Sequence, residues 1–223
     1  MRTTWHGHAC FEIAGEKRIL IDPFLRGNPT ADIGPGDVHP DILLITHGHE
    51  DHLGDAVEIA RRAKPKVACI HEISVYLGEE GIEAEGMNFY GTLDLGGVLV
   101  TMVPAWHSSS HAGRYMGTAA GFVIEMEGRR VYHAGDTGLF SDMRLIGELF
   151  KPDLFLVPIG DRYTLSPALA ARAVELVSPR VAIPMHFGTF PVLVKEATEF
   201  RELIEAKGKT KAVILRPGES YEL

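Results

Sequence analysis

The sequence is poor in cysteine, in side-chain amides and in long apolar runs. Its two cysteines, Cys10 and Cys69, form no C-x-x-C motif, which excludes a disulfide framework and a cysteine zinc cage. With two asparagines and no glutamine, it avoids thermolabile amides, which predicts a thermophilic source. No stretch approaches the roughly 18 apolar residues of a membrane span, and the N-terminus carries His6 and His8 in place of an apolar signal core. We therefore expect a cytoplasmic protein without membrane insertion.

Basic residues are also in the minority. The chain has 22 lysines and arginines against 30 aspartates and glutamates, a formal net charge of −8. Because a nucleic-acid surface needs a concentrated basic footprint, this balance argues against a nucleic-acid partner. A small anionic substrate held by one or two arginines remains compatible with it. At 45% hydrophobic and 23% charged residues, the composition is that of a globular domain and excludes a mainly disordered chain.

The apolar pattern predicts several strands followed by βα units, and this order occurs twice. In the first half we expect strands at Thr3–His6, Cys10–Ile13, Arg18–Ile21, Asp41–Thr46 and Lys66–Ile70, and helices at Leu53–Ala63 and Glu72–Leu77. In the second half we expect strands at Thr92–Leu95, Val98–Val103, Ala119–Met126, Arg129–His133, Leu154–Ile159, Val181–Met185 and Ala212–Leu215. Its helices are expected from an N-cap at Ser141 to Phe150, from Ser166 to Val177 and over Val194–Ala206. Two sheets faced by helices would bury these strands, so we predict one α/β domain over residues 1–223, a four-layer α-β-β-α sandwich.

Histidine is abundant, with 11 residues, and its densest cluster lies in Thr46–His52. This segment follows an expected buried strand and precedes a helix, where α/β proteins place reactive groups. Its three histidines and Asp51 supply ligands that suit zinc and neighbouring first-row metals. Gly48 would allow the tight loop conformations that such a site needs. A solvated histidine-rich turn is the alternative, which the buried strand before the segment disfavours.

The spacing His47-x-His49-x-Asp51-His52 resembles the metallo-β-lactamase superfamily signature. That superfamily adds a histidine after a later strand, an aspartate after the next hairpin and a histidine near the C-terminus. Residues of these types occur in the same order, each just past an expected strand: His107, Asp136 and His186. The resemblance covers nearly the whole chain, and it implies the same α-β-β-α fold and a hydrolytic activity.

Four further motifs narrow the resemblance to one branch of that superfamily. They are Gly7-His8-Ala9, Ile21-Asp22-Pro23, Ala134-Gly135-Asp136-Thr137 and His186-Phe187-Gly188-Thr189-Phe190. This branch includes lactonases similar to the ascorbate-6-phosphate enzyme, and the chain is most similar to the UPF0173 metal-dependent hydrolases. Members commonly have Gly-Gly-Asn-Phe-Thr-Met where this chain has Gly160–Leu165, Gly-Asp-Arg-Tyr-Thr-Leu. That departure leaves the substrate preference open.

The resemblance implies a dinuclear metal centre with seven ligands. His47, His49 and His107 would form one metal site, Asp51, His52 and His186 the other, and Asp136 would bridge both. We expect two divalent ions, zinc first, with manganese, iron or nickel as alternatives. A hydroxide between the ions would be the nucleophile, and Asp51 is the expected catalytic residue because it can orient the hydroxide or handle its proton.

Other residues near these motifs have two interpretations each. Asp22 either fixes the tautomer of a ligand histidine or only caps a strand. His8 either lines the pocket and supports the ligands or packs in the core. His111 is a weaker alternative to His107 as ligand, and His133 is expected to be structural.

We therefore predict a hydrolase that attacks an ester-type bond, a phosphoester or a lactone, of a small anionic substrate. Arg162 is the first candidate for an anion clamp, with Arg114 as the second, because the guanidinium fork suits phosphate or carboxylate. The alternative for Arg162 is a surface ion pair with Asp161 or another acid. Two other functions stay open: an oxidoreductase of the same fold, similar to persulfide dioxygenases, and a metal-binding scaffold without turnover. A homo-oligomer is compatible with the resemblance.

Overall fold

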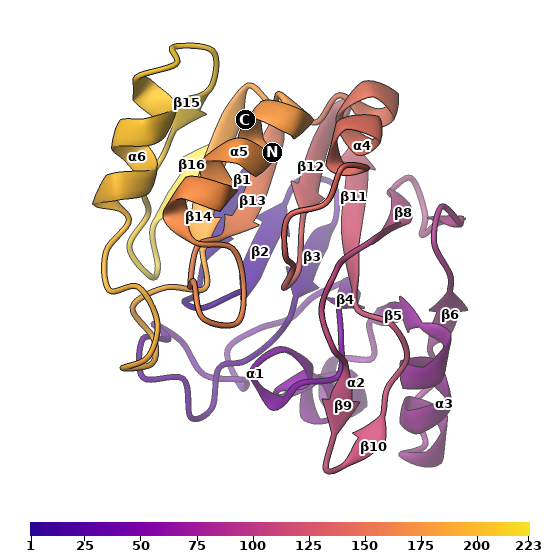
Figure 1. Cartoon of the computed structure of the whole chain (residues 1–223). Helices are drawn as coiled ribbons and strands as arrows, with labels where there is room; N and C mark the ends of the chain where they lie inside the picture. The colour runs from indigo at the N-terminus through magenta and orange to yellow at the C-terminus, as the bar shows by residue number, and fades with distance from the viewer.

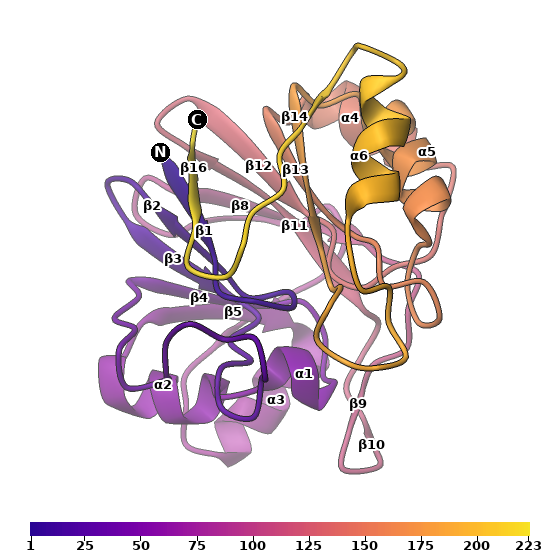
Figure 2. The ribbon, with the colours of Figure 1, turned by 90° about the vertical axis from the view of Figure 1, so that its left-hand side faces the viewer.

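Two seven-stranded sheets pack face to face in the computed structural model, which describes residues 1–223. Helices cover the outer face of each sheet, so the layers run α-β-β-α (Figures 1 and 2). This arrangement confirms the fold predicted from the sequence. No helix combines the length and apolar character that crossing a bilayer requires.

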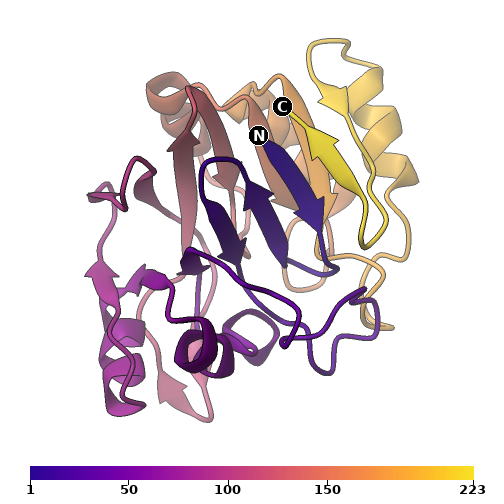
Figure 3. The same ribbon diagram turned by 180° about the vertical axis from the view of Figure 1, so that it is seen from behind.

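The first sheet is built mainly from the N-terminal half of the chain. Its strands are β1 (Arg2–Trp5), β2 (Phe11–Ala14), β3 (Arg18–Ile21), β4 (Ile42–Ile45), β5 (Lys66–Ile70), β6 (Glu85–Met87) and β16 (Ser220–Glu222). They lie in the order β16-β1-β2-β3-β4-β5-β6, antiparallel up to β3 and parallel from β3 to β6. Outside this sheet lie α1 (Glu50–Leu53), α2 (Ala56–Ala63) and α3 (His71–Glu79) (Figure 2). The pairing of β1 with β16 puts the two termini side by side (Figure 3).

The second sheet repeats this plan. Its strands are β7 (Thr92–Asp94), β8 (Leu99–Pro104), β11 (Ala120–Met126), β12 (Arg129–His133), β13 (Leu154–Pro158), β14 (Val181–Met185) and β15 (Lys211–Ala212). Their order is β15-β14-β13-β12-β11-β8-β7, antiparallel from β7 to β12 and parallel from β12 to β15. Outside it lie α4 (Met143–Phe150), α5 (Pro167–Val177) and α6 (Thr198–Glu205). A small hairpin, β9 (Ser110–His111) and β10 (Arg114–Tyr115), projects from the body (Figure 1).

Apolar side chains from both sheets form the main core. A cluster of 42 buried residues lies between and around the sheets, and a second cluster of 20 lies between the second sheet and its helices. Strands β4, β13 and β14 are buried along their whole length, because parallel strands in such a sandwich are covered on both faces. Their continuous apolar runs are the reason that the sequence pattern locates them well.

Backbone hydrogen bonds tie the two sheets together at one edge. The amide of Ala120, in β11, donates to the carbonyl of Thr46, just past β4, at 3.0 Å. The amide of His186, just past β14, donates to the carbonyl of His8 at 2.9 Å. The loops that follow strands of both sheets are thereby held against one another, and the histidine-rich segments belong to these loops.

Some element boundaries differ from the sequence-based expectations. Ser141 is not an N-cap, because α4 begins at Met143 and the Ser141 hydroxyl bonds Asp142 instead. Helix α6 begins at Thr198, not at Val194, because the Val194 amide donates to the carbonyl of Gly160 and keeps that stretch in a loop. Helix α3 continues through Gly78 to Glu79.

The last strand was also misplaced. β15 covers Lys211–Ala212, not Ala212–Leu215, because the chain then crosses to the first sheet. Strands β6 and β16, helix α1 and the β9–β10 hairpin were not predicted.

Candidate metal centre

Five predicted site residues each follow the end of a strand. Asp22 comes directly after β3, and His47, His107, Asp136 and His186 follow β4, β8, β12 and β14 within three residues. Because parallel neighbours end at the same edge of a sheet, the fold brings residues far apart in sequence together. Asp51 and His52 lie in the short helix α1, which begins immediately after the histidine-rich loop.

The first ligand set, His47, His49 and His107, offers ring nitrogens that all lie within 4.8 Å of one another. His47 Nε2 and His49 Nδ1 are 3.0 Å apart. Two ligands of a tetrahedral zinc ion lie about 3.3 Å apart, from Zn–N bonds of about 2.05 Å. The spacing therefore suits a shared ion, and all three side chains belong to the set that the sequence predicts.

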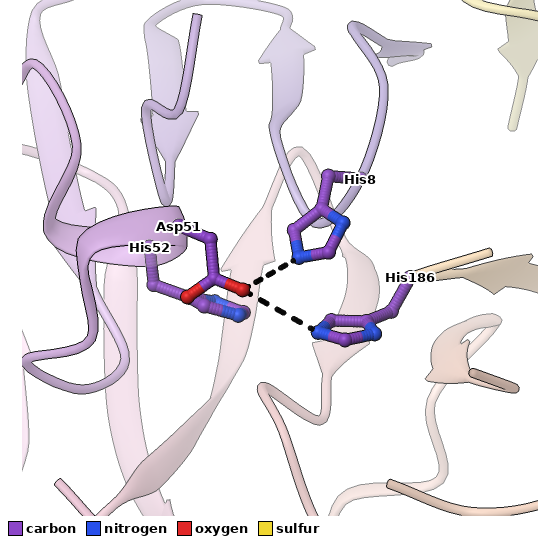
Figure 4. Close-up of side chains that lie close together, drawn as sticks. All are labelled: His8, Asp51, His52 and His186. Carbon is purple, nitrogen blue, oxygen red and sulfur yellow. Dashed lines mark hydrogen bonds and ion pairs between the residues drawn. The ribbon is translucent and has the colours of Figure 1, made fainter. Parts of the chain in front are cut away.

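The second set contains the predicted residues Asp51, His52 and His186. Together with His8, these residues offer ligand atoms that all lie within 4.8 Å of one another. Figure 4 shows the four side chains. Asp51 Oδ2 is 3.1 Å from His8 Nε2 and 3.9 Å from His186 Nε2. These side chains come from the β1–β2 turn, from α1 and from the end of β14, so the set forms only when the two sheets pack together.

Asp136 lies between the two sets. Its Oδ1 is 3.3 Å from His52 Nε2, and its Oδ2 is 3.0 Å from His186 Nε2 and 3.6 Å from His107 Nε2. The Asp136 carboxylate also falls within 4.8 Å of ligand atoms of His47 and His52. One buried carboxylate therefore faces histidines of both sets, the arrangement that a bridging ligand requires.

Several ligand atoms of this cluster are buried without a hydrogen bond. They are His52 Nε2, Asp136 Oδ1 and His186 Nε2. His52 Nε2 and Asp136 Oδ1 are close enough to attract, yet their geometry is not that of a hydrogen bond. An unsatisfied buried polar group costs about 1–3 kcal/mol and calls for a partner. A divalent cation supplies that partner, so the residues present fit a metal centre.

Asp22 holds two of these histidines in position. His52 Nδ1 donates to Asp22 Oδ2 at 2.7 Å, and the Thr46 amide and hydroxyl donate to the two Asp22 oxygens at 2.8 and 2.7 Å. The Thr46 hydroxyl in turn accepts from His47 Nδ1 at 3.0 Å. Both imidazoles therefore carry their proton on Nδ1 and turn Nε2 toward the centre. Of the two interpretations of Asp22, the geometry matches the tautomer-fixing one.

His8 supports the second set from the first sheet. It is fully buried, and its Nδ1 lies 3.0 Å from the Thr189 hydroxyl while its Nε2 faces Asp51. Burial and the neighbouring His186 lower the pKa of His8 to about 4, so the ring is neutral, donates from Nε2 and accepts at Nδ1. His8 and His186 both have a left-handed backbone, at φ 54° and 60°, a conformation that non-glycine residues adopt mainly where the surroundings enforce it.

The electrostatics of most of these groups suit cation binding; at His52 burial would lower the pKa, but Asp136 and Asp22 raise it. Burial lowers the pKa of His47, His49 and His107, so these imidazoles are neutral near pH 7 with free lone pairs. Burial alone would raise the pKa of Asp136, but His186 and His52 hold it well below its usual value. Burial would also raise the pKa of Asp51, but the hydrogen bond from His8 outweighs it and lowers the pKa. Both carboxylates are therefore ionised.

Other candidates lie away from the cluster. The His111 ring lies tilted against Tyr76, with centroids 5.4 Å apart, and belongs to neither set, whereas His107 faces Asp136. His133 is structural, because its Nε2 donates to the carbonyl of Ala9 at 3.0 Å. The Arg114 guanidinium is already paired with Glu79.

Arg162 is exposed on the loop after β13. Its guanidinium lies 5.9 Å from the Tyr163 ring, and it makes no ion pair, so the expected alternative of a pair with Asp161 or another acid is not observed. No measured contact joins Arg162 to the cluster.

Three contributors to the site were missed in the sequence analysis. Thr46 and Thr189 orient histidines, and Ser109 accepts a hydrogen bond from the Gly48 amide at 3.1 Å. The position of Thr46 directly before His47 was a signal that could have identified it. The expected role of Gly48 was also wrong: its φ is not positive, and glycine is needed because a Cβ would lie 2.5 Å from Met116 Cβ.

Comparisons with known proteins identify the family of the chain. The sequence model described as "Beta-lactamase superfamily domain" matches residues 2–186. The chain is 53% identical to a UPF0173 metal-dependent hydrolase from Archaeoglobus fulgidus, over 100% of this chain and 99% of that one. The chain belongs to the UPF0173 metal-dependent hydrolases of the metallo-β-lactamase superfamily. The family assignment confirms the enzyme class that the sequence predicts.

Solved structures extend the family comparison to three dimensions. The structure of Igni18, described as a novel metallo hydrolase from the hyperthermophilic archaeon Ignicoccus hospitalis, has a TM-score of 0.92 at 38% identity and covers 100% of this chain and 98% of its own. CmlA, a diiron β-hydroxylase from Streptomyces venezuelae, has a TM-score of 0.79 at 18% identity, over 100% of this chain and 54% of its own. The second likeness concerns the fold alone.

Proposed function

We propose that this UPF0173 hydrolase cleaves a phosphoester or a lactone in a small anionic substrate with the help of two divalent metal ions, zinc first. His47, His49 and His107 hold one ion in this proposal, and Asp51, His52 and His186 hold the other. The observation that carries the proposal is the Asp136 carboxylate, whose two oxygens face histidines of both sets at 3.0 to 3.6 Å. Ions bound there would lower the pKa of a water between them and stabilise negative charge on the substrate.

The protein's own residues supply orientation and proton handling. Asp51 is ionised and only half-buried, so it can accept a hydrogen bond from the attacking water or take its proton. The hydrogen bond from His8 fixes which way its carboxylate faces. Asp22 and Thr46 keep the Nε2 atoms of His52 and His47 free for an ion. No serine or cysteine nucleophile is needed in this scheme.

Metal content tests the ligand sets. Elemental analysis after reconstitution with zinc or manganese is expected to approach two ions per chain. Asp136→Ala is expected to lower the occupancy of both sites, and loss from one site alone would refute the bridge. His107→Ala and His111→Ala form a matched pair, because only His107 belongs to a ligand set. Protein that binds neither zinc nor manganese under any reconstitution condition would refute the proposal.

Turnover tests the chemistry. We expect activity in a screen of phosphodiesters, phosphomonoesters, lactones and thioesters, and we expect Asp51→Asn to lower kcat much more than it raises KM. Unchanged activity in a variant with unchanged metal content would remove Asp51 from the mechanism. Iron-loaded protein that consumes oxygen with a thiol persulfide, and hydrolyses nothing, would favour an oxidoreductase instead. Metal binding without turnover in either assay would favour a scaffold.

A further inference from the structure

Two phenylalanines beside the second ligand set pack against neither apolar core. Phe24, in the loop after β3, and Phe190, in the loop after β14, are half-buried, and neither belongs to or packs against the two core clusters. The other half-buried phenylalanines all pack against at least one of these clusters: Phe89, Phe150 and Phe187. Filling the interior therefore does not account for the rings of Phe24 and Phe190.

The two rings lie against His8 and against each other. Phe24 and Phe190 both meet the His8 ring edge-on, with centroids 5.8 and 5.4 Å from that of His8. Their own centroids are 6.2 Å apart, because the loops that carry them lie side by side (Figure 1). We call this pair the phenyl wall. His8 Nε2 is 3.1 Å from Asp51 Oδ2, so a single imidazole ring connects the phenyl wall to the second ligand set.

Apolar residues extend the phenyl wall beyond Phe190. Pro191 and Val192 follow it and are exposed, and residues 187–194 include no charged side chain. On the other side, the Asp55 carboxylate near Phe24 accepts hydrogen bonds from the amides of Leu25 and Arg26. Several neighbouring apolar residues at the surface, next to a group of polar ligand atoms, are typical of a site for a small molecule.

Trp106 offers a competing apolar surface at the first ligand set. It directly precedes His107 and is 68% exposed. Its ring stacks on Phe140, a member of the second core cluster, with centroids 6.1 Å apart. Trp106 therefore has a core partner, whereas the phenyl wall has none.

A molecule held at the second ligand set lies within reach of the phenyl wall. His8 is closed to solvent, while the Asp51 side chain keeps 29% of its surface exposed. Asp51 and the two half-buried phenyl rings are thus the accessible groups around the buried His8 ring. A molecule that contacts Asp51 and extends past His8 reaches the phenyl rings.

We propose that the phenyl wall receives an apolar arm of the substrate, an aryl or alkyl group whose attached reacting group lies at the metal centre. Phe24 and Phe190 are then specificity-determining residues. This inference rests on the proposed hydrolysis at that centre and narrows its substrate to an amphipathic ester. Aromatic side chains offer a large apolar area and favour edge-on or offset contact with another ring, so an aryl arm gains more at the wall than a methyl group.

The experiment is a calorimetric titration of the zinc-loaded protein with methylphosphonate and phenylphosphonate, at a pH at which both are fully ionised. The two probes share an anionic head, contain no ester bond and differ only in the arm. In the parent, phenylphosphonate is expected to bind about tenfold more tightly, because the phenyl group loses more apolar surface to the wall.

Phe190→Ala should remove most of this preference, since it deletes one of the two rings. Phe89→Ala is the matched control, a half-buried phenylalanine in the connection between β6 and β7 that packs against the main core, and it should keep the preference. Elemental analysis checks that each variant retains its zinc. If circular dichroism shows that Phe190→Ala is unfolded, Phe24→Ala takes its place, and the comparison of the two probes in the parent needs no variant.

Several results would overturn the proposal. They are equal affinities of the two probes in the parent, binding of neither probe, and a preference that persists in Phe190→Ala. A preference that is lost in Trp106→Ala but kept in Phe190→Ala would also overturn it, because the arm would then lie beside the first ligand set.

Failure of the phenyl wall and failure of the proposed hydrolysis give different results. A preference for phenylphosphonate that depends on Phe190, in a protein that cleaves none of the screened esters, would refute the hydrolysis and support the wall. Ester hydrolysis in a protein that binds both probes equally would do the reverse.

Discussion

Asp22 orients two proposed ligand histidines with a single carboxylate. It accepts from His52 directly and from His47 through the Thr46 hydroxyl, and all three partners are buried. Because the carboxylate is buried, its charge acts at close range on rings that would otherwise be free to exchange tautomers. Most of the geometric precision of this side of the centre therefore depends on one residue that would not itself touch a metal ion.

Asp22→Asn should weaken metal binding about 10- to 100-fold without unfolding the protein. The amide has the same shape as the carboxylate but lacks its charge. A loss of this size in metal affinity is usual when a hydrogen-bond partner of a metal-binding histidine is removed. Competition with a chelator measures the affinity. Asp32→Asn is the matched control, because Asp32 pairs with His6 at 2.9 Å outside the centre. Equal affinities in the parent and in Asp22→Asn would show that Asp22 is only structural.

Arg162 is the residue whose role depends most on the substrate. It is exposed and lacks an acidic partner, so its guanidinium is available to an anion. Once a substrate is known, Arg162→Ala should raise KM about tenfold for the anionic form and leave a neutral analogue almost unaffected. Arg144→Ala serves as the control. A similar loss for both analogues would assign Arg162 a structural role.

The backbone of the histidine-rich loop closely approaches Met116, which directly follows β10. A Cβ at Gly48 would lie 2.5 and 2.6 Å from Met116 Cβ and Cγ. Gly48 therefore permits the contact between this loop and the segment after the small hairpin. His47 and His49 flank the glycine, so any shift of the loop moves two proposed ligands.

Gly48→Ala should destabilise the fold by about 1–3 kcal/mol, the usual cost of overpacking, and weaken metal binding in parallel. Urea unfolding measures the first effect and chelator competition the second. Gly36→Ala is the control, because nothing lies within 4 Å of the Cβ it would add. With Met116→Gly added, which removes both the Cβ and the Cγ of Met116, the double variant should lose less than the sum of the single losses. Strict additivity would contradict the clash.

Elements were predictable where their pattern is local. The apolar runs of β4, β13 and β14 locate these strands because both of their faces are buried. The sequence pattern places the start of α6 too early, because Val194 continues the helical apolar spacing. The amide of Val194 donates to the carbonyl of Gly160, far away in the sequence, and this hydrogen bond holds Val194 in a loop. Strand β16 is short and half-exposed, and its partner β1 lies at the other end of the chain. No local pattern encodes that pairing.

At the scale of the whole molecule, the candidate centre is the junction of the two sheets. The types of the proposed ligands and their order were readable from the sequence, because His47, His107, Asp136 and His186 each follow a strand. Their partition into two sets came from the resemblance. The contact of His8 with Thr189 arises only when residues of both sheets meet. The burial of Asp136 among histidines of both sets makes the cluster a place where folding and metal binding depend on each other.

Metal removal should therefore lower the thermal stability of the entire domain. An ion that binds only the folded chain stabilises it by about 2.7 kcal/mol when its free concentration is 100 times its Kd. In a chain of this size, that corresponds to a Tm shift of about 5–11 °C per ion. Calorimetry with zinc and with excess chelator measures the difference. In Asp136→Ala the same comparison should give a much smaller shift, because the carboxylate facing both sets is gone. A parent protein whose Tm is unchanged by chelator would show that the buried histidines are satisfied without a metal ion.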